Sequence, residues 1–187
     1  KLNKSDLTVN LNGNQFTSDL STLSSDDEFL YFAEARQFRK VRKSDLSTVH
    51  SVSLTPSNAP TYSVLDNKYA YVVNLGSTGQ PSYVTKIEKE NLNIVGEFVM
   101  PTGLSGITVD DKMAYIGFSN VQGVSFYDKE TFSLLFNTSQ ADANSHNTAS
   151  IVVDGDFVYF GGLQVGVRAV QKITNYELYE KLGYRRV

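Results

Sequence analysis

The stretch VDDKMAYIGF, residues 109–118, is a polar turn followed by a run that is apolar on both faces. Related stretches stand elsewhere in the chain: SDDEFLYFAE from Ser25, LDNKYAYVVN from Leu65 and VDGDFVYFGG from Val153. Their central tyrosines are separated by 40, 44 and 44 residues and are Tyr31, Tyr71, Tyr115 and Tyr159. A period of this length is typical of a repeat architecture in which each period forms one structural unit.

A second phrase has the same period. It reads KLNKSDLT from Lys1, KVRKSDLS from Lys40, KIEKENLN from Lys86, FYDKETFS from Phe126 and KITNYELY from Lys172. Its second and seventh positions are apolar or aromatic in every copy and recur at intervals of 39, 46, 40 and 46 residues. Two independent patterns therefore indicate one repeat.

Each period predicts four β-strands and no helix. In the third copy the strands are SGITV (105–109), KMAYIGF (112–118), GVSFYDK (123–129) and FSLLFNT (132–138), rich in residues that favour strands. The turns between them use Asp, Asn and Gly, which suit tight turns. Aspartates also repeat with the period, and one turn aspartate per unit is too few for calcium, so we interpret them as turn caps: Asp66, Asp110, Asp111, Asp154 and Asp156.

The second strand of each unit indicates how the units pack. Successive side chains of a strand point to opposite faces, so Tyr69, Tyr71 and Val73 lie on one face and Ala70 and Val72 on the other. Both faces are apolar, whereas the sheets of a sandwich would bury one face each. The predicted fold is therefore an all-β β-propeller of four-stranded antiparallel blades, with about four blades in this chain.

These residues resemble a known group of blades. The pattern V-D-x-x-x-x-Y-h-x, then a loop, then V-x-K-I-x-x-x-x-L-x-h-V, is seen best in YVTKIEKENLNIV from Tyr83 and is similar to the repeats of the YVTN and PQQ-like propeller superfamily. The resemblance covers nearly the whole chain and implies architecture rather than activity. Because quinone-binding blades carry a tryptophan motif and this chain has no Trp, no quinone or other cofactor is expected.

The repeat divides the chain into units but leaves the ring open to two interpretations. We expect an outer hairpin of a preceding blade at 1–20, then blades at 21–60, 61–104, 105–147 and 148–187. This arrangement gives four inner hairpins and five outer ones. Either the chain is an internal segment of a larger propeller, or its N-terminal strand closes the ring against the last blade.

Composition narrows the possible partners. A net charge of −3 argues against nucleic acid binding, and the apolar runs are shorter than the roughly 18 residues of a membrane span. With no cysteine and two histidines in different layers, neither a thiolate nor a multi-histidine metal site is expected. We interpret the local basic run as a solvated strand face; its members are Arg36, Arg39, Lys40, Arg42 and Lys43.

A binding site is expected in loops that do not repeat. The loops from each outer strand to the next inner strand gather at one mouth of a propeller, and the longest spans residues 137–149. It contains Asp142, Asn144, His146 and Asn147, which could coordinate a cation or hydrogen-bond a sugar, or could be a solvated turn. The other histidine, His50, falls in a predicted outermost strand.

The sequence favours a non-catalytic function. Neither a G-x-S-x-G nor a phosphate-binding G-x-x-x-x-G-K-[ST] motif is present. Glycosylation sequons at Asn3 and Asn137 indicate an extracellular or cell-surface protein, with the cytoplasm as the alternative. We expect a scaffold that binds a protein or glycan or assembles with itself. The alternative is a propeller enzyme of lactonase or lyase type that uses His146 and an acid at the channel mouth.

Overall fold

The computed structural model describes residues 20–54, 60–76, 80–118, 124–137, 148–154, 157–164 and 167–174. Within these ranges the chain forms antiparallel strands and no helix. The strands are β1 (Leu20–Ser25), β2 (Phe29–Glu34), β3 (Gln37–Arg42), β4 (Thr48–Ser53), β5 (Pro60–Leu65), β6 (Tyr69–Asn74), β7 (Ser82–Glu88), β8 (Ile94–Met100), β9 (Leu104–Val109), β10 (Met113–Phe118), β11 (Val124–Asp128), β12 (Leu134–Asn137), β13 (Thr148–Asp154), β14 (Phe157–Gln164) and β15 (Val167–Thr174).

The strands form four sheets, each a meander in chain order. The first sheet is β1–β4, the second β5–β8, the third β9–β12, and the fourth contains β13–β15 in the part that the structure describes. Within each sheet, every strand pairs antiparallel with its neighbour in sequence. The predicted repeat of antiparallel, four-stranded units is confirmed for the first three sheets.

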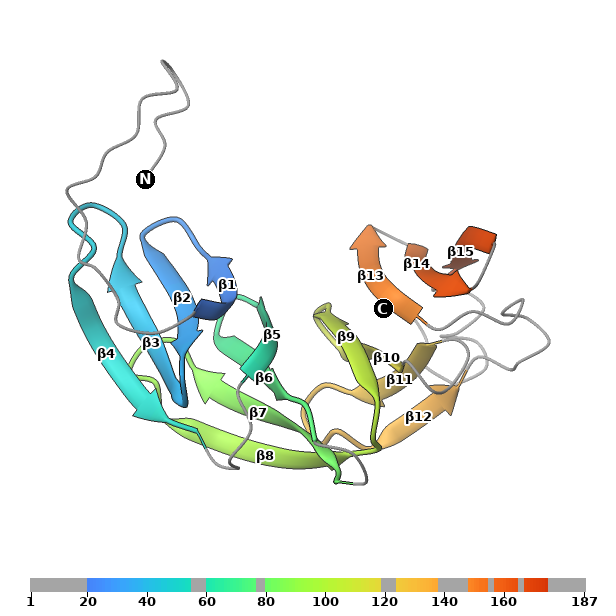
Figure 1. Cartoon of the computed structure of the whole chain (residues 1–187), viewed down its shortest axis with the longest axis horizontal. Helices are drawn as coiled ribbons and strands as arrows, with labels where there is room; N and C mark the ends of the chain where they lie inside the picture. The colour runs from blue at the N-terminus through green and yellow to red at the C-terminus, as the bar shows by residue number, and fades with distance from the viewer. Residues whose placement is uncertain are drawn as a thin grey trace, which may run out of the picture.

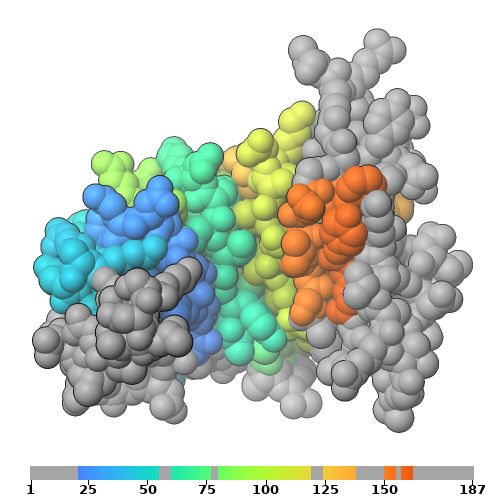
Figure 2. Space-filling view, turned by 90° about the horizontal axis from the view of Figure 1, so that it is seen from above, coloured from blue at the N-terminus to red at the C-terminus, as the bar shows by residue number. Residues whose placement is uncertain are grey.

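The sheets are arranged in a propeller-like arc. The first strand of each sheet lies on the inner side of the arc and the fourth on the outer side (Figure 1). The inner strands contact one another in the order β1, β5, β9, β13. Seen from above, the sheets lie side by side in chain order, from blue to orange (Figure 2).

Apolar side chains fill the space between consecutive sheets, and we call each such contact surface a junction. The second strands of the first three sheets are buried on both faces over most of their length, and every residue of β10 is buried. Ala114 and Ile116 pack into the second junction, between the second and third sheets, while Met113 and Tyr115 pack into the third. The prediction that this strand fills the gaps on both sides is confirmed.

The turn before the outer strand differs from the predicted strand boundary. The sequence predicts Phe132 in the outer strand, but this residue lies in the turn with a φ of 53°, and β12 begins at Leu134. Leu46 and Leu92 hold the same place with a φ of 59° each. Left-handed backbone is unusual for residues other than glycine. At Leu92 and Phe132 it directs the side chain into the core of the preceding junction.

Among the described residues there is no helix that is both long and apolar enough to cross a membrane.

Candidate functional site

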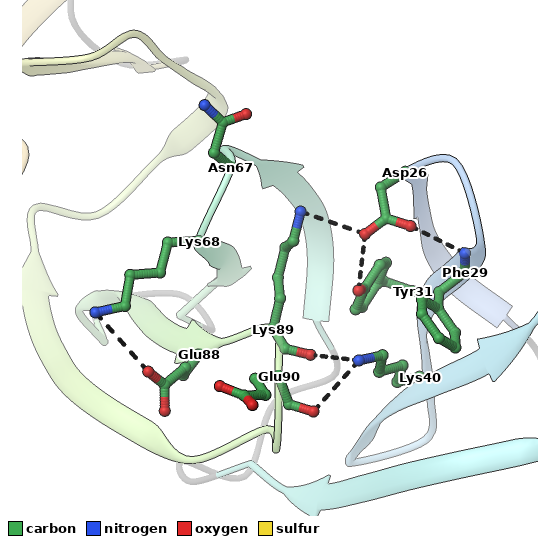
Figure 3. A pocket seen from close by; sticks show the side chains of 9 residues that line it. All are labelled: Asp26, Phe29, Tyr31, Lys40, Asn67, Lys68, Glu88, Lys89 and Glu90. Carbon is green, nitrogen blue, oxygen red and sulfur yellow. Dashed lines mark hydrogen bonds and ion pairs between the residues drawn. The ribbon is translucent and has the colours of Figure 1, made fainter.

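A cavity of about 430 Å³ opens at the first junction, between the first and second sheets (Figure 3). It lies at the end of the sheets where the β1–β2 and β3–β4 turns meet, since the Lys43 amide donates to the Glu28 carbonyl there. The loops predicted to bind a ligand leave from the opposite end of the strands. The cavity is lined by Asp26, Phe29, Tyr31, Lys40, Asn67, Lys68, Glu88, Lys89 and Glu90.

Asp26 organises the turn between β1 and β2. Its Oδ1 accepts hydrogen bonds from the amides of Glu28 at 3.2 Å and Phe29 at 2.9 Å. Its Oδ2 accepts a hydrogen bond from the Tyr31 hydroxyl at 2.9 Å. One carboxylate can make all three bonds because the hairpin brings β2 back alongside the aspartate. The turn amides two and three residues later and the tyrosine five residues later then lie within its reach.

The same three bonds recur in the next two sheets. Asp66 accepts from the amides of Lys68 and Tyr69 and from the Tyr71 hydroxyl at 2.9 Å. Asp110 accepts from the amides at positions 112 and 113 and from the Tyr115 hydroxyl. The aspartates that the sequence interprets as turn caps are therefore caps at Asp66 and Asp110, and each also holds a buried tyrosine.

Lys89 ties the first sheet to the second. Its ammonium lies 3.3 Å from Asp26 Oδ2 across the junction and donates to the carbonyl oxygen of Asp66 in its own sheet at 2.9 Å. Its side chain is 14% exposed, so the charge is largely removed from water and needs both partners. Lys129 repeats the arrangement at the second junction, 3.2 Å from Asp66 Oδ2.

A second lysine reaches in the other direction. Lys40 donates to the carbonyl oxygens of Lys89 at 2.9 Å and Glu90 at 3.3 Å in the following sheet, with its ammonium 4.2 Å from the Phe29 ring centroid. Its equivalent, Lys86, lies 2.7 Å from a Glu130 carboxylate oxygen. Each of these two junctions is therefore closed by one lysine pointing forward and one pointing back.

The network shifts the pKa values of Asp26 and Tyr31 in opposite directions. Burial raises the pKa of the Asp26 carboxyl, but bonds from the Phe29 amide, the Tyr31 hydroxyl and the Lys89 ammonium outweigh burial and leave that pKa below its usual value. Burial and the bond to Asp26 raise the pKa of Tyr31 well above its usual value. Near neutral pH the carboxylate is therefore ionised and the phenol is protonated.

One sequence-based interpretation is wrong. The sequence predicts that Lys40 lies on a solvated strand face, but the residue is 8% exposed and points into the first junction. Arg39, on the other face of β3, pairs with Glu34 at 2.9 Å. The run alternates between faces because it lies on a strand, and only its members outside the junction, such as Arg36 and Arg42, are exposed.

The loop predicted to bind a ligand lies outside the described residues, with its four candidates Asp142, Asn144, His146 and Asn147, as does Asn3. Asn137 ends β12 and is exposed. His50 lies in the outer strand β4, also exposed. In the ranges that the structure covers, no three or more His, Cys, Asp or Glu side chains are grouped to hold a metal ion.

Comparison with known proteins supports the fold. No family model matches this chain, and no curated protein does. The computationally designed Ika4 protein aligns with a TM-score of 0.67 at 11% identity over 86% of this chain and 95% of its own. The designed Ika8 protein aligns with a TM-score of 0.65 at 11% identity over 86% of this chain. Kuenenia stuttgartiensis hydrazine synthase aligns with a TM-score of 0.65 at 18% identity over 90% of this chain.

This chain spans about half the length of those last two proteins, 48% and 50% respectively. At such low identity the likeness extends to the fold alone. The class that the fold defines is a propeller-like, all-β repeat protein.

Proposed function

We propose that this chain is a non-catalytic β-propeller scaffold with blades of the YVTN and PQQ-like kind, acting outside the cell or at its surface. Its loops would bind a protein or a glycan. One observation carries the proposal. Among the described residues, the aspartate, tyrosine and lysine side chains that could act in catalysis are bonded to one another and join neighbouring sheets.

The pKa directions support this proposal. A general acid or base works best when its pKa lies near the working pH. The pKa of Asp26 and that of Asp66 are lowered, and those of Tyr31 and Tyr71 are raised, so these groups move away from neutrality rather than toward it. Burial opposes the shift in the two aspartates and is outweighed by hydrogen bonds. Such groups are suited to holding a structure.

Repetition supports it as well. A catalytic site needs one constellation, whereas the Asp–Tyr–Lys set occurs at both the first and the second junction with nearly the same distances, 3.3 and 3.2 Å for the ion pair. Repetition of one set at two junctions is expected of contacts that hold sheets together, because both junctions do the same structural work. The binding function then falls to loops that differ from copy to copy.

The first experiment separates scaffold from enzyme. The chain and its His146→Ala variant are assayed against a panel of lactones and small esters, and we expect no turnover that depends on His146. The chain is also applied to a glycan array together with a variant in which residues 138–147 are replaced by Gly and Ser. The proposal is supported if the chain binds a glycan, the loop variant loses that binding and the Asp26→Asn variant keeps it. The proposal is overturned if the chain turns over a substrate and His146→Ala abolishes that turnover.

The second experiment addresses the compartment. Asn137 is exposed on an outer strand, as an acceptor for glycosylation must be. Secreted from a eukaryotic host behind a signal peptide, the chain should carry glycan at Asn137, detected by mass spectrometry and absent in Asn137→Gln. An unmodified Asn137 in a fully secreted product would remove this support for an extracellular site of action.

A further inference from the structure

We propose that the two ends of the arc fit one another, so that two copies of this chain form a closed ring head to tail. The fourth sheet of one copy would pack on the first sheet of the other. This inference goes beyond the scaffold function, which stands whether or not the ring forms, and it follows from the way the internal junctions are built.

The first and second junctions each join two different surfaces. We call the surface with the lysine the donor side and the surface with the aspartate the acceptor side. The following sheet supplies a lysine and an apolar side chain on a left-handed turn: Lys89 with Leu92, and Lys129 with Phe132. The preceding sheet supplies an aspartate and the tyrosine five residues later. Leu92 is 2% exposed in the core with Tyr31, and the Phe132 ring lies 6.0 Å from that of Tyr71.

The first sheet carries the donor side on its outward end. Leu46 has the same φ of 59° as Leu92, and its amide donates to the Arg42 carbonyl at 2.9 Å, as the Leu92 amide does to Glu88. Lys43 donates to the carbonyl of Asp26 in its own sheet, as Lys89 does to that of Asp66. Leu46 is half-buried, whereas its two equivalents are buried.

The fourth sheet carries the acceptor side on its outward face. Val158 and Phe160 point into the third junction, so Phe157 and Tyr159 lie on the opposite face of β14. Their rings are 6.2 Å apart, like the 6.4 Å pair of Tyr69 and Tyr71. Asp154, five residues before Tyr159, is exposed.

The degree of burial shows that this face differs from its equivalents. Tyr31, Tyr71 and Tyr115 are 0 or 1% exposed because a further sheet covers each of them, whereas Tyr159 is half-buried. The backbone register is also that of an acceptor sheet, since Tyr159 is opposite Lys172 just as Tyr71 is opposite Lys86. The described part of this face therefore has an aspartate, a tyrosine and an opposing lysine at the same positions as the acceptor sheets.

A second copy of this chain is the occupant that these features favour. The positive end, Lys43, and the negative end, Asp154, are complementary across such a contact, and one copy offers both. In Figure 1 the first and fourth sheets stand at the two ends of the arc. A head-to-tail contact closes into a ring when its rotation permits.

Charge exchange tests the ring. Sedimentation velocity on the chain should give a species of twice 20.7 kDa. Lys43→Glu and Asp154→Lys should each raise the dissociation constant at least about tenfold, the effect of about 1.4 kcal/mol at the interface. The double variant, Lys43→Glu with Asp154→Lys, should restore the dimer because both contacts then hold the exchanged pair.

Arg36→Glu is the matched control, because Arg36 is an exposed cation of the first sheet at the other end of its strands. It should leave the dissociation constant unchanged. Circular dichroism checks that each variant folds, and rescue in the double variant answers any loss of folding in a single one. A monomer at about 100 μM, where a micromolar contact is saturated, would overturn the proposal, as would an open series of larger species or a double variant that fails to recover.

Discussion

The second and third junctions of the molecule both contain a buried central tyrosine but differ in the side chain opposite it. Lys86 is opposite Tyr71 in the second sheet, and Phe126 is opposite Tyr115 in the third. Lys86 sends its ammonium to Glu130 in the next sheet. Phe126 instead packs edge to face on Tyr115 at 5.2 Å and joins an apolar core with Val158.

This difference shows that the repeat fixes the position of a contact and leaves its chemistry open. The partner sheet decides which chemistry fits. In the second junction the following sheet places the Lys129–Glu130 turn next to Tyr71. The ammonium of Lys86 can therefore donate to the Lys129 carbonyl and the Glu130 carboxylate. In the fourth copy the sequence has Asn175 where the second and third copies have Lys89 and Lys129. The stability that the second junction draws from its ion pair between Lys129 and Asp66 should therefore depend on pH.

The largest effect is expected from breaking the apolar junction. Phe126 is fully buried, so Phe126→Ala should lower the free energy of unfolding by about 3–5 kcal/mol through lost burial and the cavity left behind. Urea unfolding followed by circular dichroism measures it. Phe136→Ala, at a half-buried ring of the same sheet, should cost clearly less. A Phe126→Ala variant no less stable than Phe136→Ala would show that this ring does not hold the junction.

A medium effect is expected from breaking the charged junction. Asp66→Asn weakens the contacts to Lys129 and Tyr71 and should lower the free energy of unfolding by about 1–3 kcal/mol near neutral pH. Burial raises the pKa of Asp66, but amide bonds from Tyr69 and Lys68 and side-chain bonds from Tyr71 and Lys129 lower it further, to below its usual value.

The sign of the pH dependence follows from that lowered pKa. As pH falls, the unfolded chain takes up its proton before the folded protein does, so the stabilisation is present above the usual carboxyl pKa and is lost as pH falls through the folded value. The deficit of Asp66→Asn should shrink in acid, while that of Phe126→Ala should persist. Asp111→Asn, an exposed aspartate in a hairpin turn, is the control. An Asp66→Asn deficit independent of pH would contradict the assignment.

Much of the fold could be predicted from the sequence because its signals are periodic. Alternation in the second strand required burial on both faces, and β6 and β10 show it. The turn aspartates were predicted as caps, but their bonds to tyrosine hydroxyls were not, since a five-residue separation does not by itself indicate contact across a hairpin.

The lysines were missed for a physical reason. Charged residues are seldom buried, so Lys40 within a basic run was interpreted as solvated. The available signal was the period itself: lysine recurs at the first position of the second phrase in Lys40 and Lys86 and at the fourth in Lys89 and Lys129. A solvated face has no reason to keep one residue type in register. Nor could the left-handed turn at Leu92 be predicted, because that conformation usually indicates glycine.

The smallest effect should come from the exposed carboxylate of the second junction. The Glu130 side chain is 68% exposed, and Lys86 is 5% exposed, so their 2.7 Å pair is screened on one side. Glu130→Gln should therefore change the free energy of unfolding by about 0–1 kcal/mol, the range of surface ion pairs.

The first junction gives an independent reason to expect so little from Glu130. There Lys40 reaches the carbonyl oxygens of Lys89 and Glu90, so backbone acceptors alone can receive the ammonium. Lys86→Met should cost more than Glu130→Gln in the same urea titration, because it removes the donor from the Lys129 carbonyl as well. If Glu130→Gln proved as costly as Lys86→Met, the carboxylate would be the required acceptor. The lysine would then depend on a side chain at the second junction and on backbone carbonyls alone at the first.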